Sequence, residues 1–155
     1  MGAPSVSFVL VSGGSQVQSP TANPPFLPAV ATYLQEGNAS VWTVSFTDEN
    51  GLPMTPQTIV WNLSDDKGNI INGRHDVPIP TPAQSVKVVL TGSDTMRLTF
   101  DDDVRCLKVS GTYNSSNGNG LTFAAQYYFG LIPLAVETLS VSLTSSPASS
   151  PRVLA

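Results

Sequence analysis

Charged residues are scarce in this chain, at 12% of its 155 residues, against roughly 25% in an ordinary soluble domain. The seven lysines and arginines are spread along the sequence, and the net charge is −4. Because a protein that follows phosphate groups needs a basic face, we expect no binding to nucleic acid. The polar surface must then consist mostly of Ser, Thr, Asn and Gln. Such a surface is common in all-β proteins and in chains that pack against other chains.

Cysteine, histidine and long apolar runs are also nearly missing. The single cysteine, Cys106, excludes a disulfide within the chain, and His75 is the single histidine. Zinc sites need several such side chains, so we expect no metal and no cofactor. No apolar run is long enough for a membrane span. The opening MGAPSVSFVLVSGGS has no basic segment, so we expect no signal peptide and synthesis in a reducing cytoplasm.

Proline and glycine, at 13 and 12 residues, predict many turns and divide the chain into three parts. Residues 1–28 are predicted to be an N-terminal arm and linker, with β-forming residues at 5–11 followed by SGGSQVQSPTANPPFLP. Residues 29–133 alternate between strand and turn patterns. Residues 134–155 are predicted to be a C-terminal extension that could form one more strand around Leu139, Val141 and Leu143.

Alternation of apolar and polar residues predicts strands at 42–47, 59–63, 70–71, 86–90, 107–113 and 121–129. Turn sequences such as DENG, DDKGN and NSSNGNG separate them, and a proline-rich loop follows residue 77. The spacing is typical of an all-β sandwich of about seven strands. The one helical indication is at residues 93–98, where Ser93 could cap a single turn.

Acidic residues at the strand ends are predicted to shape turns rather than to do chemistry. Asp48 with Glu49, and Asp65 with Asp66, stand beside Asn and Gly, and Asp and Asn bond readily to a turn backbone. Neither segment has the ligand spacing of a calcium loop. The acidic triplet at residues 101–103 is expected to be a solvated loop neutralised by the flanking Arg97 and Arg105, and the alternative is an adventitious divalent ion.

A nucleophilic catalytic site would have to combine His75 with Cys106. Nothing in the sequence places these two residues together, so we predict a surface histidine, a semi-buried cysteine and no catalytic residue. Trp61 is predicted to lie in the core. Tyr128 is out of phase with Tyr127, which predicts an outward contact surface. An alternative use of the aromatic residues Tyr33, Trp42, Tyr113, Tyr127 and Tyr128 is stacking on sugars.

Four stretches carry a resemblance to a known family. They are YLQEGNAS from Tyr33, VWTVSFTDENGLPMTPQTIVWNLSDDKGNIIN from Val41, VKVVLTGSDTMRL from Val86, and LKVSGTYNSSNGNGLTFAAQYYF from Leu107. With their F-x-D-E-x-G-x-P-x-x-P and W-x-L-x-D-x-x-G patterns, residues 31–133 resemble immunoglobulin-like structural proteins of tailed bacteriophage virions. The resemblance implies an immunoglobulin-like sandwich with an extended arm and tail. The chain lacks the cysteine pair of antibody domains, so packing around Val44, Trp61 and Val109 must replace that bridge.

The resemblance further implies a non-enzymatic decoration or cement protein that binds and stabilises the capsid exterior. Its partners would be the major capsid protein and sister copies, as a homo-oligomer on the virion surface assembled in the host cytoplasm, without nucleic acid or membrane. An edge strand at residues 8–11 could add to a neighbour's sheet. Deletion of residues 1–28 is then expected to abolish capsid binding and leave the β domain folded. The alternatives are a head–tail junction or tail protein, and a glycan-binding adhesion module. The interface candidates are Phe8, Leu10, Phe26, Tyr128, Leu139, Val141 and Leu143.

Overall fold

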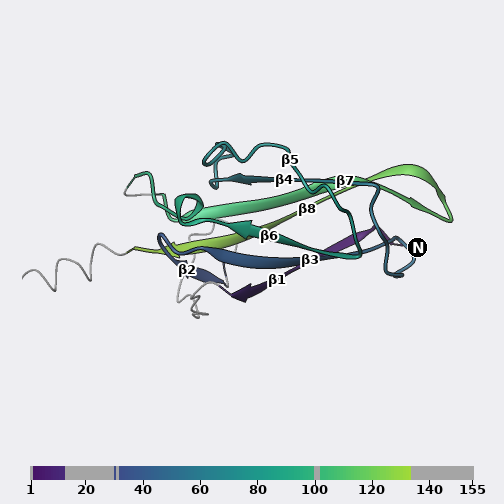
Figure 1. Cartoon of the computed structure of the whole chain (residues 1–155), viewed down its shortest axis with the longest axis horizontal. Coiled ribbons are helices and arrows are strands. Elements are labelled where there is room, and N and C mark those ends of the chain that lie inside the picture. Colours follow the sequence, from purple (N-terminus) through teal and green to yellow (C-terminus); the bar gives the residue numbers. More distant parts are fainter. Residues whose placement is uncertain (1, 13–29, 31, 100–101, 134–155) are drawn as a thin grey trace, which may run out of the picture.

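The computed structural model describes residues 2–12, 30, 32–99 and 102–133, which form eight strands and one short 3-10 turn (Figure 1). A three-stranded sheet has the order β1-β3-β6, and a five-stranded sheet has the order β2-β8-β7-β4-β5. The all-β sandwich predicted from the sequence is therefore confirmed. In chain order the strands are β1 (Ser5–Ser12), β2 (Tyr33–Gln35), β3 (Ser40–Thr47), β4 (Thr58–Ser64), β5 (Val77–Pro78), β6 (Ser85–Leu90), β7 (Val104–Ser115) and β8 (Gly118–Ile132).

Strand pairing is antiparallel except between β2 and β8, which run parallel. Figure 1 shows the β7–β8 hairpin reaching past the end of β4. The sequence predicted a loop over residues 114–120, but all but two of these residues belong to β7 and β8. Conversely, Ile70 makes only an isolated bridge with Ser64 rather than a strand. The two-residue β5 lies in the predicted proline-rich loop, and Pro78 is tolerated because β5 is an edge strand.

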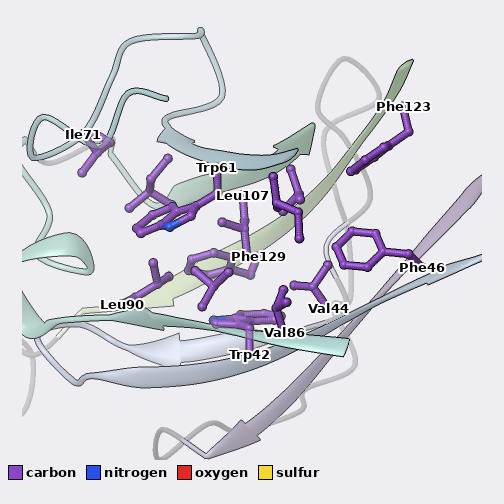
Figure 2. Close-up of a cluster of buried hydrophobic side chains, with 14 of the residues drawn as sticks. Trp42, Val44, Phe46, Trp61, Ile71, Val86, Leu90, Leu107, Phe123 and Phe129 are labelled. Carbon is purple, nitrogen blue, oxygen red and sulfur yellow. The ribbon is translucent and has the colours of Figure 1, made fainter. Parts of the chain in front are cut away.

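The core is built from the alternating residues of both sheets. On β3 every second side chain is buried, including Trp42, Val44 and Phe46, as a half-buried strand requires. Figure 2 shows Trp42 and Trp61 entering the core from opposite sides with Phe129 between them. The ring centroids of Trp42 and Phe129 are 5.2 Å apart. The indole nitrogen of Trp42 donates to Ser40 Oγ at 3.0 Å, so its polar group is satisfied inside the core.

Packing across the middle of the sandwich follows the expectation for a domain without a disulfide bridge. Val44 and Val109 are fully buried, Trp61 is 6% exposed, and all three belong to one apolar cluster. Cys106 is a free thiol outside this cluster. Apolar contact alone therefore joins the two sheets at this level.

Strand β1 corrects the prediction that the first residues form an arm outside the sandwich. It pairs with β3 of the same chain, from Ser5 opposite Thr47 to Ser12 opposite Val41. Its inward side chains, Phe8 among them, pack against the core, and the Phe8 ring stacks on Tyr127 at 5.7 Å. The physical reason is that an apolar stripe with period two needs cover, and β3 offers an open edge beside it. Because β3 takes the pairing of β1 on one side only, the addition of a neighbour's strand to residues 8–11 stays a prediction for the other edge of β1. The rest of the predicted arm and the predicted extension at 134–155 lie outside the described residues.

The predicted turn chemistry is confirmed at two aspartates. Asp48 Oδ1 accepts hydrogen bonds from the backbone amides of Asn50 and Leu52 at 2.8 and 3.0 Å. Asp65 Oδ1 accepts from the amides of Lys67 and Asn69 at 2.8 and 2.9 Å. These bonds close the two turns locally.

The predicted helical turn exists, but it begins earlier than expected. It spans Gly92–Asp94, and its N-cap is Thr91 rather than Ser93. The Thr91 amide donates to Asp94 Oδ2 at 2.7 Å. The capping signal from Ser93 was therefore wrong by two residues, because the side chain of Asp94 folds back onto Thr91.

Candidate functional site

A buried carboxylate, Asp94, ties two loops together at one end of the sandwich. Its side chain accepts hydrogen bonds from Asn72 Nδ2 at 2.8 Å and from Arg74 Nε and Nη2 at 2.9 and 3.0 Å. Burial raises the pKa of Asp94, but the bonds from Arg74, Asn72 and Thr91 outweigh it and hold the pKa below its usual range. Arg74 also lies over the Trp61 ring, 5.5 Å from its centroid. Both oxygens of the Asp94 carboxylate are occupied by donors of this chain, so we interpret the arrangement as structural.

Within the acidic triplet, Arg105 neutralises Asp102 as predicted, but the Asp102 side chain is mostly buried rather than solvated. Arg105 is fully buried, its Nη1 and Nη2 contact Asp102 Oδ1 and Oδ2 at 2.5 and 3.0 Å, and Nη2 also donates to the Met96 carbonyl. Burial raises the pKa of Asp102, but the hydrogen bonds from Arg105 and the Leu98 amide lower it by more. The pKa of Asp102 is therefore below its usual range. Asp103 is exposed, and Asp101 lies outside the described residues. Among the residues that the structure describes, no group of three or more acidic, His or Cys side chains is placed to hold a metal ion.

Glu49 has a second role that the turn pattern did not predict. Its carboxylate accepts hydrogen bonds from Tyr113 Oη at 2.7 Å and from the side chains of Ser115 and Asn117. The bonds from Ser115, Asn117 and Tyr113 lower the pKa of Glu49 to about 2. The same contact with Glu49 raises the pKa of Tyr113 to about 12. Glu49 thus fastens the β7–β8 hairpin to the turn after β3. Only the fold brings these residues within reach, since they are more than sixty positions apart.

His75 and Cys106 line one shallow depression of about 370 Å³ on the outer face of the five-stranded sheet, although nothing in the sequence placed them together. We name this depression the β4–β7–β8 hollow. Its floor consists of two cross-strand rows set by the strand register, and its wall is the segment between β4 and β5. The rows are Ser64–Cys106–Tyr128 and Asn62–Lys108–Gln126; the wall contributes Asp65, Asp66, Gly68, Ile70, His75 and Asp76.

The thiol and the imidazole in this hollow are bound to other partners. Cys106 Sγ donates to Gln126 Oε1 at 3.7 Å, and burial raises the pKa of the thiol, which keeps it protonated and weakly nucleophilic. His75 Nδ1 bonds Asn62 Oδ1 at 3.0 Å, and its Nε2 lies 3.4 Å from Asp76 Oδ2. The pair therefore lacks the contact that activates a thiolate.

Tyr127 and Tyr128 face opposite sides of β8, as their phase predicted. Tyr127 packs into the core against Trp42, with ring centroids 5.4 Å apart, and Tyr128 lines the hollow. Of the aromatic residues considered for sugar stacking, Trp42 and Tyr113 are also buried. Tyr33 is partly buried on β2, and Tyr128 is the candidate that lines the hollow.

The opposite side of the sandwich presents the outer face of the three-stranded sheet, which we name the β1–β3–β6 face. Val9, Val11 and Val89 on this face are 55%, 55% and 53% exposed. Its other outward residues are Ser5, Ser7, Val41, Thr43, Ser45, Thr47, Ser85 and Lys87. Lys87 is the single charge in this set, and its Nζ donates to Thr43 Oγ1 at 3.3 Å. The face therefore consists mainly of hydroxyl and valine side chains.

The interface candidates from the sequence fall into three groups. Phe8 and Leu10 are partly buried and pack against the core from β1, on the side of the strand that faces the other sheet, and their role as interface residues stays a prediction. Tyr128 faces outward, over the hollow. Phe26, Leu139, Val141 and Leu143 lie outside the described residues. The sequence analysis missed Val9, Val11 and Val89, although their position between inward-facing residues was a usable signal.

No helix in the described ranges is long and apolar enough to cross a membrane. Comparison of the chain with protein-family models, with curated proteins and with solved structures finds no match.

Proposed function

We propose that this chain is a non-enzymatic structural protein that docks onto other protein subunits through the β1–β3–β6 face, as a decoration or cement protein on a bacteriophage capsid. The observation that carries the proposal is the near absence of charge from this face, next to valines that are more than half exposed. Depletion of charge is the compositional mark of the buried centre of a protein interface.

The valines give the size of the expected contact. Complete burial of a valine side chain contributes about 1.5 kcal/mol or more, so covering the exposed halves of Val9, Val11 and Val89 contributes roughly 2 to 3 kcal/mol before the costs of association. One such contact is weak. Many copies on a symmetric shell, or a homo-oligomer docked as a unit, bind through avidity.

The edge of β1 supplies a second means of attachment. In the described part of the chain, β1 is an outer strand that pairs only with β3, and SVSFVLVS contains neither charge nor proline. Natural sheets normally protect such an edge with those residues. A strand of the major capsid protein or of a sister copy could add to it, satisfying the unpaired backbone groups.

The immunoglobulin-like assignment is part of the same proposal. In immunoglobulin domains the first, second and fifth strands lie in one sheet, and the third, sixth and seventh lie in the other. When the short β2 is left out of the count, β1, β3 and β6 take the first set of positions and β4, β7 and β8 take the second. Trp61 in the core on β4 also matches the core tryptophan on the third strand. The resemblance of residues 31–133 to virion proteins is the basis on which we propose a virion location. The separate partners of His75 and Cys106 support a role without catalysis.

The test is quantitative mass spectrometry of particles purified from the phage that encodes the chain. We expect a copy number comparable to that of the major capsid protein. A number that fits a single ring would instead indicate a head–tail junction or tail protein. Absence of the chain from purified particles would refute the virion proposal.

The docking face is tested by rebinding purified protein to particles that lack it. We expect a variant carrying Val9→Lys and Val11→Lys to lose binding, because both lysines would have to be desolvated in the contact. Leu98→Lys is the matched control, since Leu98 is 69% exposed and lies outside this face. Equal binding by the two variants would contradict docking through the β1–β3–β6 face.

A further inference from the structure

The β4–β7–β8 hollow lies on the sheet opposite the docking face, so a docked chain would present it away from the capsid. The outer side of a sandwich sheet is flat unless a loop rises beside it. Here residues 65–76 form such a rim along the strand floor. Asn72 and Asp76 within it have positive φ angles of 54° and 50°, a strained backbone that proteins retain where a particular loop path is needed.

The polar groups of the hollow suit a ligand with many hydroxyls. The Asn62 amide is committed to His75 and Asp76, whereas Gln126 offers an exposed side-chain amide on the floor. The Lys108 ammonium and the Asp66 carboxylate have no hydrogen-bond or ion-pair partner within the described chain. The lining of the hollow thus offers both hydrogen-bond donors and acceptors. A sugar hydroxyl both donates and accepts, so it can bond to groups of either kind.

The charge of the lining selects among polar ligands. Lys108 is the one lysine or arginine among the lining residues, against the three carboxylates of Asp65, Asp66 and Asp76. This balance disfavours a phosphate or an acidic sugar. The oxygens of Asp65 already accept bonds from Lys67, Asn69 and the Asn69 amide side chain, so that carboxylate is committed to its turn. A neutral ligand fits the remaining groups best.

Tyr128 supplies the apolar element that a sugar site needs. The side chain is partly buried at the end of the Ser64–Cys106–Tyr128 row, and Gln126 Nε2 donates to its hydroxyl at 3.3 Å. That bond fixes the phenol and leaves an aromatic ring beside the polar groups. A pyranose ring has an apolar C–H face that packs on such a ring while its hydroxyls reach the amides.

We propose that the β4–β7–β8 hollow binds a unit of a neutral saccharide, with Tyr128 packing on the sugar ring and Gln126, Lys108 and Asp66 bonding its hydroxyls. The volume of about 370 Å³ lies near the lower end of the range for small-molecule sites, which suits a short glycan segment rather than a large ligand. The proposal does not depend on capsid binding, because it uses the opposite sheet.

The experiment is an NMR titration of the full chain, labelled with 15N, using the methyl glycosides of glucose, galactose, mannose and N-acetylglucosamine. Sialyllactose serves as the anionic comparison. We expect saturable shifts for at least one neutral glycoside, confined to the amides of residues 62–76, 106–110 and 126–128. Sialyllactose should bind more weakly than lactose.

Variants assign the binding to the proposed residues. Tyr128→Ala should abolish the shifts and Tyr128→Phe should keep them, because the ring rather than the hydroxyl carries the packing. Lys108→Gln should weaken binding by about tenfold, the usual effect of losing a charge-assisted hydrogen bond. Lys87→Gln, the matched lysine at the middle of the opposite face, should leave binding unchanged.

Three results would overturn the proposal: no saturable shift with any neutral glycoside, undiminished binding in Tyr128→Ala, or equal loss in Lys87→Gln and Lys108→Gln. Should Tyr128→Ala fail to fold, Gln126→Ala replaces it, since Gln126 is exposed and its loss removes no core contact. Failure of the titration would leave the particle copy number untouched, so the two proposals fail separately.

Discussion

Replacing Phe8 with alanine tests whether β1 belongs to the folded domain. Phe8 stands opposite Val44 in the β1–β3 register, and its ring stacks on Tyr127 of the other sheet with centroids 5.7 Å apart. Removal of a fully buried phenylalanine costs about 3 to 5 kcal/mol. Phe8 is only partly buried, so we expect Phe8→Ala to lower the free energy of unfolding by about 2 kcal/mol.

The assay is equilibrium unfolding in urea, followed by the fluorescence of the buried Trp42 and Trp61. Val9→Ala is the matched control, because Val9 is the next residue on the same strand and is 55% exposed on the outer face. We expect this control to change the free energy of unfolding by no more than about 0.5 kcal/mol. The contrast between neighbouring positions reports the inward and outward sides of β1.

Equal effects of Phe8→Ala and Val9→Ala would refute the packing of β1, and residues 1–28 would then be an arm outside the domain.

The structure also changes what we expect from deleting residues 1–28, which the sequence predicted to leave the β domain folded. Because the deletion removes the cover that Val6, Phe8 and Leu10 give to the core, we expect the truncated domain to unfold at a markedly lower urea concentration. Loss of capsid binding by that truncation would therefore not identify a docking segment, which is why outward-facing substitutions are the better test.

The polar contacts give three further predictions. Asp94→Asn should lower the free energy of unfolding in urea by about 3 kcal/mol, because it removes the fully buried charge that pairs with Arg74. A loss below about 1 kcal/mol would contradict a structural role for this ion pair. Glu49→Gln should bring the ionisation of Tyr113, followed by ultraviolet absorbance, from about 12 down toward 10, and an unchanged titration would rule out the contact. The pKa values of Glu49 and Asp94 are lowered in the folded state, so the stability that their ionised forms contribute is present above their unfolded pKa values and is lost as the pH falls toward 2. Thermal unfolding between neutral pH and pH 2 should show this loss, and the Asp94→Asn variant should show less of it.

Alternation within each strand allowed the sequence to predict the inward residues of the core. Trp42 and Phe46 on β3, and Trp61 on β4, are buried as their period of two required. Turn chemistry at Asp48 and Asp65 was predictable for the same reason, since each aspartate bonds to amides within four residues of itself. The scarcity of charged residues likewise predicted a surface rich in uncharged polar side chains, but it did not show on which face of the sandwich they gather.

Pairing between distant strands was decided only by the tertiary structure. The period of β1 predicts an apolar side but does not say whether the strand pairs with its own chain or with a neighbour. The parallel strand β2 carries almost no local signal. It fits beside β8 because Gly130 lacks a side chain, and a Cβ there would lie 2.6 Å from the Tyr33 ring.

The candidate sites show the same division between local and distant information. The pattern of β8 predicted that Tyr128 faces outward. The hollow exists because the register aligns Ser64, Cys106 and Tyr128 while a separate loop brings His75 to the same place. The sequence by itself therefore determined a β-sandwich, its core and its turns, which depend on neighbours along the chain. Which residues share a face, a hollow or a hydrogen-bonded cluster depends on contacts between distant segments, and only the tertiary structure decided those.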